Sequence, residues 1–299
     1  MKQIEFLEKY NIKKEDFDKT GLIWEELLKI YDDYKKYKQE LEVPAVNIFN
    51  SLMKVNKVHY VRYRIKNEEH VIEKIIRKKI KDNKSEINIE NYKNILTDLI
   101  GVRAIKLYKE VWIDINSHIL KTYRKRGKPI AYYRDGDTKQ EIEKYEKQGC
   151  KAEKHKYGYR SIHYIIISQN EKQKYTVEIQ VRTIFEEAWS EIDHKIRYPY
   201  DQEHKTFLEF LLVFNRLAGT ADEMGTFIKN LQIEFASKKK ETNSNKEIIN
   251  QLETKLNKLG LDKKDLTTIK EDIEKLKDND ELTDEMRKNI LAKFINKIK

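Results

Sequence analysis

The strictest pattern in the sequence is an alternation of polar and apolar side chains at residues 176–183. Successive side chains of a β-strand point to opposite faces, so a period of two predicts a strand with one buried face. A carboxylate and a guanidinium on the polar face favour a cleft, although a solvated edge with an internal ion pair would give the same alternation. The two faces are Val177, Ile179 and Val181 on the apolar side and Glu178, Gln180 and Arg182 on the polar side.

A second strand is expected just before this one, at residues 159–168, with a polar turn at residues 169–173 between them. Two strands joined by a short polar turn are typical of a hairpin. In the earlier strand Tyr159, Ser161 and His163 share one face. The hairpin therefore predicts two adjacent strands that present all these polar side chains to one cleft.

Two further strands are expected nearer the N-terminus. One alternates, with Arg62, Arg64 and Lys66 on a cationic face, and the other is the apolar run at residues 95–107. Helices should fill most of the remainder, because the chain is 37% charged and holds only 9 Gly and 3 Pro. The sequence thus predicts an α+β fold in which helices flank a small mixed β-sheet of about five strands.

Helical spacing and breaker residues define the segments between the strands. Asn67 is a candidate helix cap, and the polar region at residues 124–156 is expected to be a mobile loop with one short helix near residues 141–148. Apolar residues recur at helical spacing in three other segments, at residues 71–80, 113–123 and 185–196.

These patterns divide the chain into four parts. Beyond residue 237 the composition turns to Lys, Glu and Asn, and apolar residues step by three and four on both sides of a break at residues 260–262. Packing of this hairpin against the chain's own body and dimerisation both fit that pattern. The parts are an N-terminal helical segment (1–56), a central domain (57–200), helices packed on that domain (201–236) and a charged C-terminal helical hairpin or extension (237–299).

The charge balance favours a polyanionic partner such as a nucleotide or RNA. Lys and Arg outnumber Asp and Glu by 61 to 51, which gives a formal net charge of +10, although an AT-rich genome also inflates lysine content. The single cysteine, Cys150, excludes an internal disulfide and fits a reducing compartment. The chain has no signal-peptide core and no apolar stretch near the roughly 20 residues of a membrane span, so we expect a soluble cytoplasmic protein.

Asp98 stands out as a carboxylate at the start of an otherwise apolar strand. Burying an unpaired carboxylate costs several kcal/mol, so it needs a cation or a metal beside it. A bridge to Arg103 or a helix cap would satisfy it. Together with Glu178 it could instead bind Mg²⁺, which takes one or two carboxylates and substrate phosphates. The cationic face of Arg62, Arg64 and Lys66, with Lys74, would then neutralise a triphosphate.

Other catalytic motifs are absent. The segment Arg126-Gly127-Lys128 has Thr122 where a P-loop needs its first glycine and Pro129 where it needs Ser or Thr. The seven histidines show no zinc-binding spacing. A nucleophile elbow is also missing, which argues against covalent acyl-transfer chemistry.

Three segments resemble the core motifs of RelA/SpoT synthetases, in the same order and with similar spacing. They are Asp98–Arg103, Gly158–His163 and Val177–Thr183, and Arg64-Ile65-Lys66 with Lys74 resembles the ATP-binding Arg-x-Lys element of the small alarmone synthetases. The resemblance covers about half the chain. It implies a nucleotidyltransferase-like fold and a GTP pyrophosphokinase, which moves pyrophosphate from ATP to the 3′-hydroxyl of GDP or GTP, makes (p)ppGpp in the stringent response and releases AMP. No metal-binding hydrolase motif precedes it, as expected of a stand-alone synthetase.

The resemblance also implies roles for individual residues. Asp98 would hold Mg²⁺ on the ATP phosphates, Glu178 would share the metal or act as the base on the 3′-hydroxyl, and Tyr159 would stack on the guanine. The remaining assignments are Arg64, Lys66 and Lys74 for the ATP phosphates, and Lys154, Lys156, His163, Gln180 and Arg182 for the acceptor side.

The acceptor loop departs from the family pattern. Family members usually carry Asn two residues before the stacking tyrosine and Lys four before it, whereas this chain has Tyr157 and His155. The resemblance therefore leaves an alternative open: a toxin-type relative that pyrophosphorylates the 3′ end of tRNA or makes adenine alarmones. A non-catalytic regulator that binds nucleotide or RNA is a third, less favoured interpretation, because both carboxylates and the tyrosine are intact.

Overall fold

The computed structural model describes residues 2–84, 86–170, 173–197 and 205–256. It divides into two compact units, Met1–Phe227 and Ile228–Lys299. In the second unit the described part is a single helical segment, and the hairpin expected around residues 260–262 lies outside the described residues. The domain boundaries expected from the sequence stay a prediction.

A seven-stranded mixed sheet forms the centre of the first unit, in the order β1-β2-β7-β6-β4-β5, with β3 paired to β6. β2 runs parallel to β7 and β4 parallel to β5, while the other pairs are antiparallel. The mixed α+β class is confirmed. The strands are β1 (Val58–Ile65), β2 (Ile100–Lys106), β3 (Arg124–Lys125), β4 (Ile130–Tyr133), β5 (Lys151–Lys154), β6 (Ser161–Asn170) and β7 (Gln173–Thr183).

Two details of the expected sheet were wrong. Residues 124–156 are not simply a loop with a helix, because β3, β4 and β5 lie there and raise the strand number above five. Each of these strands spans four residues or fewer, which is too short to show a period of two. The strand expected from residue 95 begins at Ile100, so Asp98 lies in the turn before β2.

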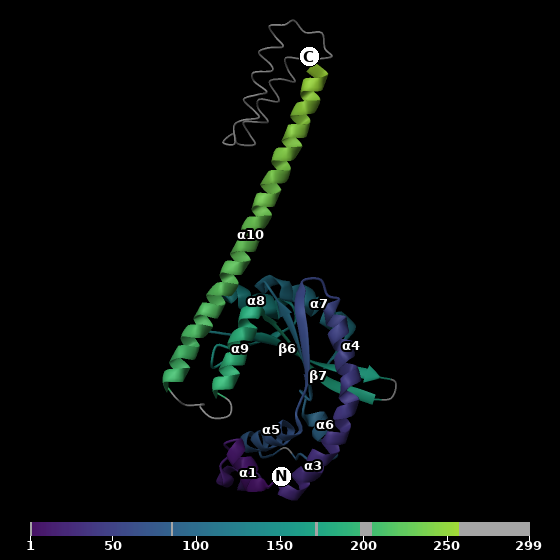
Figure 1. The fold of residues 1–299 in the computed structure, drawn as a ribbon, viewed down its shortest axis with the longest axis vertical. Helices are drawn as coiled ribbons and strands as arrows, with labels where there is room; N and C mark the ends of the chain where they lie inside the picture. The colour runs from purple at the N-terminus through teal and green to yellow at the C-terminus, as the bar shows by residue number, and fades with distance from the viewer. Residues whose placement is uncertain (1, 85, 171–172, 198–204, 257–299) are drawn as a thin grey trace. The chain divides into compact units, whose positions relative to one another are not determined.

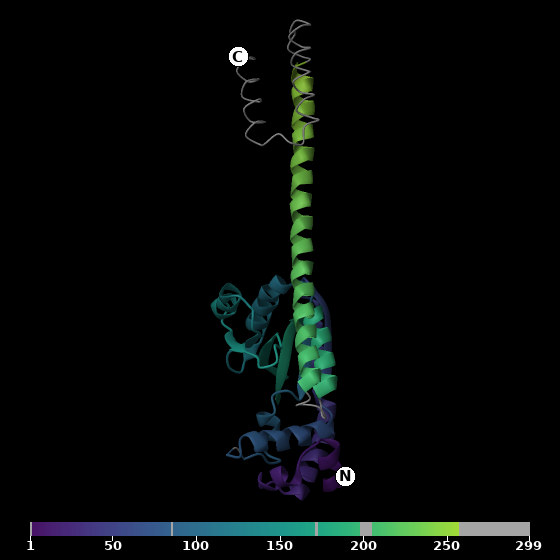
Figure 2. The same ribbon diagram turned by 90° about the vertical axis from the view of Figure 1, so that its left-hand side faces the viewer.

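Helices cover both faces of the sheet and one end of it. α4 and α7 pack on the apolar face, α9 packs against β2 and β7 on the opposite face, and α3 packs on α5 (Figure 1). Figure 2 shows α1 and α5 together at one end of the sheet. The helices are α1 (Gln3–Lys9), α2 (Lys14–Asp18), α3 (Trp24–Tyr37), α4 (Glu42–Met53), α5 (Glu68–Lys81), α6 (Tyr92–Ile95), α7 (Trp112–Thr122), α8 (Lys139–Lys147), α9 (Ile184–Arg197) and α10 (Lys205–Leu256), with short 3₁₀ turns η1 (Lys38–Leu41) and η2 (Lys109–Val111).

The core follows from the alternation read in the sequence. Val177 and Ile179 of β7 and Val102 of β2 are fully buried, and the Asn67 side chain accepts a hydrogen bond from the backbone N–H of Glu69. The antiparallel pairing of β6 and β7 and the Asn67 helix cap, both expected from the sequence, are confirmed. Among the described helices, none is both long enough and apolar enough to cross a bilayer.

The part of α10 within the first unit presents two different faces. Leu211 is only 3% exposed and its carbonyl accepts a hydrogen bond from the Trp189 indole of α9 (3.0 Å). Phe210 and Leu217 are 70% and 62% exposed. The apolar residues that share helical spacing in this segment are therefore split between a packed face and an open one.

Asp222 is the titratable group that ties α10 to the end of β7. Its side chain is buried, and the Thr183 hydroxyl donates to Oδ2 at 2.8 Å. The pKa of Asp222 is raised to about 7: burial is the largest cause, the charge of Glu186 acts in the same direction, and the Thr183 hydrogen bond, Lys106 and Lys109 oppose the rise. The folded protein therefore binds a proton here that the unfolded chain releases at a lower pH.

This raised pKa predicts a pH dependence of stability. The unfolded pKa of Asp is about 3.9, so between about pH 4 and 7 the folded state binds more protons and the free energy of unfolding falls as pH rises. We expect Asp222→Asn to remove that fall and to be more stable than wild type at pH 8, by roughly 1–3 kcal/mol. Urea unfolding at pH 5 and pH 8 measures this, with exposed Asp18→Asn as the control. A less stable Asp222→Asn at pH 8 would contradict it.

Candidate active site

The polar face of the sheet gathers functional groups from four adjacent strands. In one row across the strands Arg64 of β1 pairs with Gly101 of β2, which pairs with Glu178 of β7. The Arg64 side chain lies over Gly101, because a Cβ there would be in ordinary van der Waals contact with it at 3.6 Å. The next row consists of Arg62, Arg103, Gln180 and His163.

Five side chains on this face form a closed ring of hydrogen bonds. Nδ1 of His163 lies 3.2 Å from Glu178 Oε1, and its Nε2 lies 2.8 Å from the Tyr159 hydroxyl. Arg182 donates to the Tyr159 hydroxyl at 2.7 Å and also to the side-chain oxygen of Gln180. Gln180 closes the ring by donating to Glu178 Oε2 at 2.8 Å. Each member fixes the orientation of its neighbours.

The ring keeps Glu178 ionised although the side chain is largely buried. Burial raises the pKa of Glu178, but the hydrogen bonds from His163 and Gln180 and the His163 charge outweigh burial, so the net pKa lies below its ordinary value. The charge of Asp98 acts in the raising direction, as expected of a neighbouring carboxylate. Glu178 is thus a carboxylate with a fixed orientation, poised to accept a proton or a cation.

Asp98 forms the second half of the site. Its Oδ2 lies 3.0 Å from the Lys66 ammonium and 2.5 Å from that of Lys74 on α5. Burial raises the pKa of Asp98, and the two lysines more than offset it, so the net pKa is lowered. Its Oδ1 is buried and has no hydrogen-bond partner among the described residues.

This free oxygen fits a magnesium ion that arrives with its substrate. Mg²⁺ keeps most of its ligands as water or phosphate oxygens and takes one or two carboxylates from the protein. Among the residues that the structure describes, no group of three or more His, Cys, Asp or Glu could hold a metal by itself. The donor set of Asp98, with Glu178 nearby, therefore suits a metal that takes most of its ligands from outside the protein.

Not every residue expected at the site joins it. The bridge from Asp98 to Arg103 is wrong, because the Arg103 guanidinium pairs with Glu187 at 2.8 Å and with Glu191, both on α9. Lys154 is mostly exposed and pairs with Asp135 (2.6 Å). The ammonium of Lys156 lies 5.1 Å from the centre of the Tyr157 ring. These two lysines stand apart from the hydrogen-bonded ring, so their role on the acceptor side stays a prediction.

Comparison with known proteins finds a known family region in the chain. Residues 63–203 match the model described as "Region found in RelA / SpoT proteins", and this stretch contains all three motifs and the ring. The chain therefore contains a RelA/SpoT region, which spans just under half of its length. No curated protein matches the chain.

The solved structures that this chain resembles include proteins from Bacillus subtilis and Streptococcus pneumoniae. The small alarmone synthetase 1 from Bacillus subtilis is 22% identical, with a TM-score of 0.46 over 71% of this chain and 98% of that chain. A GTP pyrophosphokinase family protein from Streptococcus pneumoniae is 21% identical, with a TM-score of 0.44 over 71% of this chain and 95% of that chain. The B. subtilis small alarmone synthetase 1 bound to its product pppGpp is also 21% identical, with a TM-score of 0.41 over 69% and 96%.

Within the RelA/SpoT region, α9 supplies groups that sequence reasoning missed. Glu187 binds both Arg103 of β2 and Arg182 of β7, the latter at 3.1 Å, and Glu191 one turn later reaches Arg103. Two glutamates four residues apart on one helix were the available signal. These acids neutralise two buried guanidiniums and hold Arg182 in reach of Tyr159.

The RelA/SpoT region also depends on α10 to hold the loop that carries Tyr159. Gly158 has φ +74°, and its carbonyl accepts a hydrogen bond from the Asn215 side chain at 2.9 Å. Arg134 donates to the Asn215 carbonyl at 2.8 Å and to its side-chain oxygen at 2.9 Å. Gly219, one turn later, makes room for that guanidinium, because a Cβ there would lie 2.4 Å from Arg134 Nη2.

This contact gives a matched pair of substitutions in one helix. Gly219→Ala should displace Arg134 and loosen the loop, which we expect to lower the free energy of unfolding by roughly 1–3 kcal/mol. Gly225→Ala, where a Cβ meets nothing within 4 Å, should instead stabilise the helix by about 0.5–1 kcal/mol. Urea unfolding of the two variants measures the difference. Equal effects of the two substitutions would contradict the role assigned to Arg134.

Proposed function

We propose that this protein transfers pyrophosphate from ATP to the 3′-hydroxyl of GDP or GTP and releases AMP. The observation that supports this most strongly is the pairing of two carboxylates with different surroundings on one sheet face. Asp98 lies between two lysines and keeps one oxygen free, whereas Glu178 is oriented by a ring that includes the tyrosine expected to stack on guanine. The RelA/SpoT region supports the same class of reaction.

The donor half of the site would bind ATP. Lys66, Lys74 and Arg64 place positive charge beside Asp98 and along β1, where a triphosphate needs it. When bound, Mg²⁺ would neutralise phosphate charge and draw electron density from the β-phosphorus. Asp98 would hold that ion through Oδ1, and release of Lys66 or Lys74 from Oδ2 would free an ammonium for the phosphates.

The acceptor half would position and deprotonate the hydroxyl. The 3′-oxygen forms a bond to the β-phosphorus of ATP, the bond between the β-phosphorus and its bridge to the α-phosphate breaks, and AMP leaves with the bridging oxygen. Glu178 would accept the proton of the hydroxyl, because its lowered pKa keeps it ionised at neutral pH. Most of the remaining acceleration would come from positioning and charge neutralisation, as in other phosphoryl transfers.

A product assay with several acceptors tests the proposed function. Purified protein is incubated with ATP and Mg²⁺ and with GDP, GTP, a second adenine nucleotide or deacylated tRNA in separate reactions. We expect AMP and a 3′-pyrophosphorylated guanine nucleotide with GDP or GTP, and neither with ATP alone. Absence of guanine product with every acceptor mixture would refute the proposal.

One observation favours tRNA as a second candidate acceptor. Tyr132, His155 and His163 surround Tyr159, with ring centres 5.9, 5.2 and 5.6 Å from that of Tyr159. Stacking on aromatic rings is a common way to hold unpaired bases of a single strand. Product formed only on tRNA in the same assay would select this candidate over a guanosine alarmone.

Two substitutions of Tyr159 separate stacking from orientation. Tyr159→Phe keeps the ring but removes the hydroxyl that bridges His163 and Arg182, so we expect kcat to fall by roughly tenfold with little change in acceptor KM. Tyr159→Ala also removes the stacking surface, and we expect acceptor KM to rise by roughly ten- to a hundredfold while KM for ATP changes little. Steady-state kinetics with each substrate varied in turn measures both. Tyr157→Ala, whose ring lies under Arg197, is the control.

The proposed activity implies a role in the stringent response, with the (p)ppGpp product acting as the signal. We further propose a cytoplasmic location, where ATP and GTP are available. Phe210, Leu217 and Met224 of α10 are each at least 60% exposed, which fits a homo-oligomer formed through C-terminal helices. Sedimentation of the full chain tests that assembly.

A further inference from the structure

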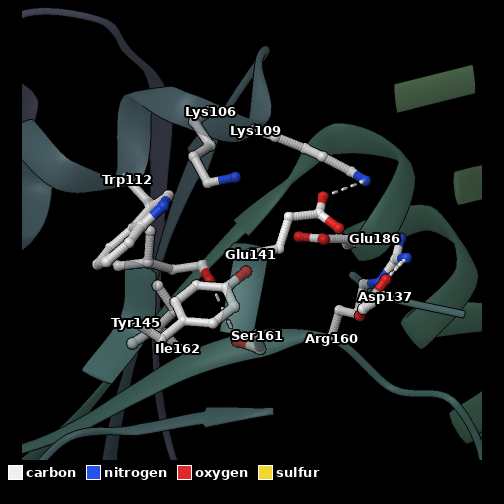
Figure 3. A pocket seen from close by; sticks show the side chains of 11 residues that line it. Lys106, Lys109, Trp112, Asp137, Glu141, Tyr145, Arg160, Ser161, Ile162 and Glu186 are labelled. Atoms are coloured by element: carbon white, nitrogen blue, oxygen red, sulfur yellow. Dashed lines mark hydrogen bonds and ion pairs between the residues drawn. The ribbon is translucent and has the colours of Figure 1, made fainter. Parts of the chain in front are cut away.

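A polar pocket lies on the sheet face opposite the hydrogen-bonded ring. Lys106 at the end of β2, Val181 of β7 and Ile162 of β6 form its floor, and α7, α8 and the start of α9 surround it (Figure 3). Lys106 lies three residues after Arg103 in β2, so the two side chains point to opposite faces of the sheet. The pocket and the ring are therefore on different sides of one sheet. The pocket itself has a cavity volume of only about 30 Å³, and it adjoins a more open groove of about 210 Å³ that shares four of its lining residues.

Lys106 is the unusual group in this pocket. The residue is only 4% exposed, yet no hydrogen bond or ion pair joins it to another described residue. Figure 3 shows its ammonium directed into the pocket. Burial lowers the pKa of Lys106, while the charges of Glu186 and Asp222 act to raise it without contacting it. Because the residue is largely buried and its ammonium has no acceptor among the described residues, an entering group that supplies an acceptor would be favoured here.

Two more donors face the same space. Tyr145 and Trp112 both line the pocket with ring centres 5.0 Å apart, and no hydrogen bond to another described residue occupies the Tyr145 hydroxyl or the Trp112 indole N–H. Figure 3 shows the Tyr145 hydroxyl pointing toward the centre of the pocket. An ammonium, a phenol and an indole together suit an acceptor group such as a carboxylate.

The other charged side chains limit what can enter. Arg160 is paired with Asp137, and Lys109 lies 3.7 Å from Glu141. The lining holds as many cationic as acidic side chains: Lys106, Lys109 and Arg160, and Asp137, Glu141 and Glu186. A multiply charged anion such as phosphate would therefore leave an excess of negative charge in the pocket.

An acceptor for a cationic group is also present. Oε2 of Glu186 accepts a hydrogen bond from the backbone N–H of Thr183 at 2.7 Å. Oε1 has no hydrogen-bond partner among the described residues. In Figure 3 the Glu186 carboxylate extends into the pocket between Glu141 and Asp137. The pocket thus offers a positive group at one side and a negative group at another, with two aromatic rings in its lining.

We propose that this pocket binds a small zwitterion of the α-amino acid type. Its carboxylate accepts from Lys106, Trp112 and Tyr145, and its ammonium donates to Glu186. Its side chain extends past the two aromatic rings into an adjoining groove that Lys109, Trp112, Glu141 and Tyr145 also line. Glu187, the residue after Glu186, pairs with Arg103 and Arg182 on the other face of the sheet. An occupant that contacts Glu186 is therefore next in sequence to the ion pairs of the candidate active site.

Thermal unfolding of the full chain with each common α-amino acid tests this proposal independently of catalysis. At ten times its Kd, a bound amino acid is expected to raise Tm by about 3 °C. Calorimetry then compares the best ligand with its decarboxylated amine, its deaminated acid and inorganic phosphate, each of which should bind at least about tenfold more weakly. Lys106→Met should lose the same affinity, and exposed Lys121→Met should not.

Three outcomes would overturn the proposal. They are the absence of binding by any amino acid, binding of phosphate or the deaminated acid as tight as that of the amino acid, and unchanged affinity in Lys106→Met. If Lys106→Met fails to fold, the ligand series on the wild-type chain decides alone. None of these results depends on transfer of pyrophosphate, so failure here and failure of the proposed function are distinguishable.

Discussion

Glu178→Gln is expected to lower kcat by roughly 10²–10⁴-fold, the range for loss of a general base, with little loss of stability. Glutamine keeps one oxygen that can accept from Gln180, and its NH2 group can donate to Nδ1 of a neutral His163, so the ring can persist, but glutamine cannot take the proton of the attacking hydroxyl. The pKa of Glu178 lies below its ordinary value, so the wild-type rate should stay flat as pH falls toward about 5.

Kinetics and urea unfolding of Glu178→Gln, measured in parallel, decide between a catalytic and a structural role. Glu146→Gln on the exposed face of α8 serves as a matched control and should behave as wild type. A Glu178→Gln variant that keeps at least a third of the wild-type kcat would contradict the assignment of this residue as the base. A variant that loses activity together with folding would point to a structural role instead.

Asp98→Asn has the second large expected effect, on both activity and stability. Turnover should fall by at least about a hundredfold, because the free Oδ1 is the oxygen assigned to the metal. Stability should fall by roughly 3 kcal/mol, because Lys66 is nearly as buried as Asp98 and would lose its counter-charge.

A double variant separates the two effects. Adding Lys66→Met to Asp98→Asn removes the orphaned buried ammonium, so urea unfolding should show stability partly restored. Activity should remain lost, since Lys66 and Asp98 are both assigned to the donor half. Recovery of turnover in the double variant would show that Asp98 is needed only to neutralise Lys66, and the metal role would be wrong.

The strands that form the ring were predictable because their pattern is strict. Alternation at residues 176–183 placed Glu178, Gln180 and Arg182 on one face, and the hairpin register brings His163 beside Gln180 as expected. The sequence pattern predicts this strand well, because a shift of its pairing register by one residue would bury its three polar side chains.

The rest of the site arises from contacts between distant parts of the chain. Glu187 on α9, and not Asp98, is the partner of Arg103, and Asn215 of α10 anchors Gly158 across 57 residues. The Asn215 contact has no local signature, and the four-residue spacing of Glu187 and Glu191 is a weak signal for the other, since a glutamate or asparagine on a helix is usually solvated. β4 and β5 were missed because each spans four residues and is defined by pairing alone.

The most direct test of the central claim is to follow label from two positions of ATP into products. With GDP or GTP as acceptor, label in the β- and γ-phosphates should appear together in the guanine nucleotide, and label in the α-phosphate should appear in AMP. This result would establish transfer of an intact pyrophosphate. Label from the γ-phosphate alone in the acceptor, with ADP as the other product, would contradict it.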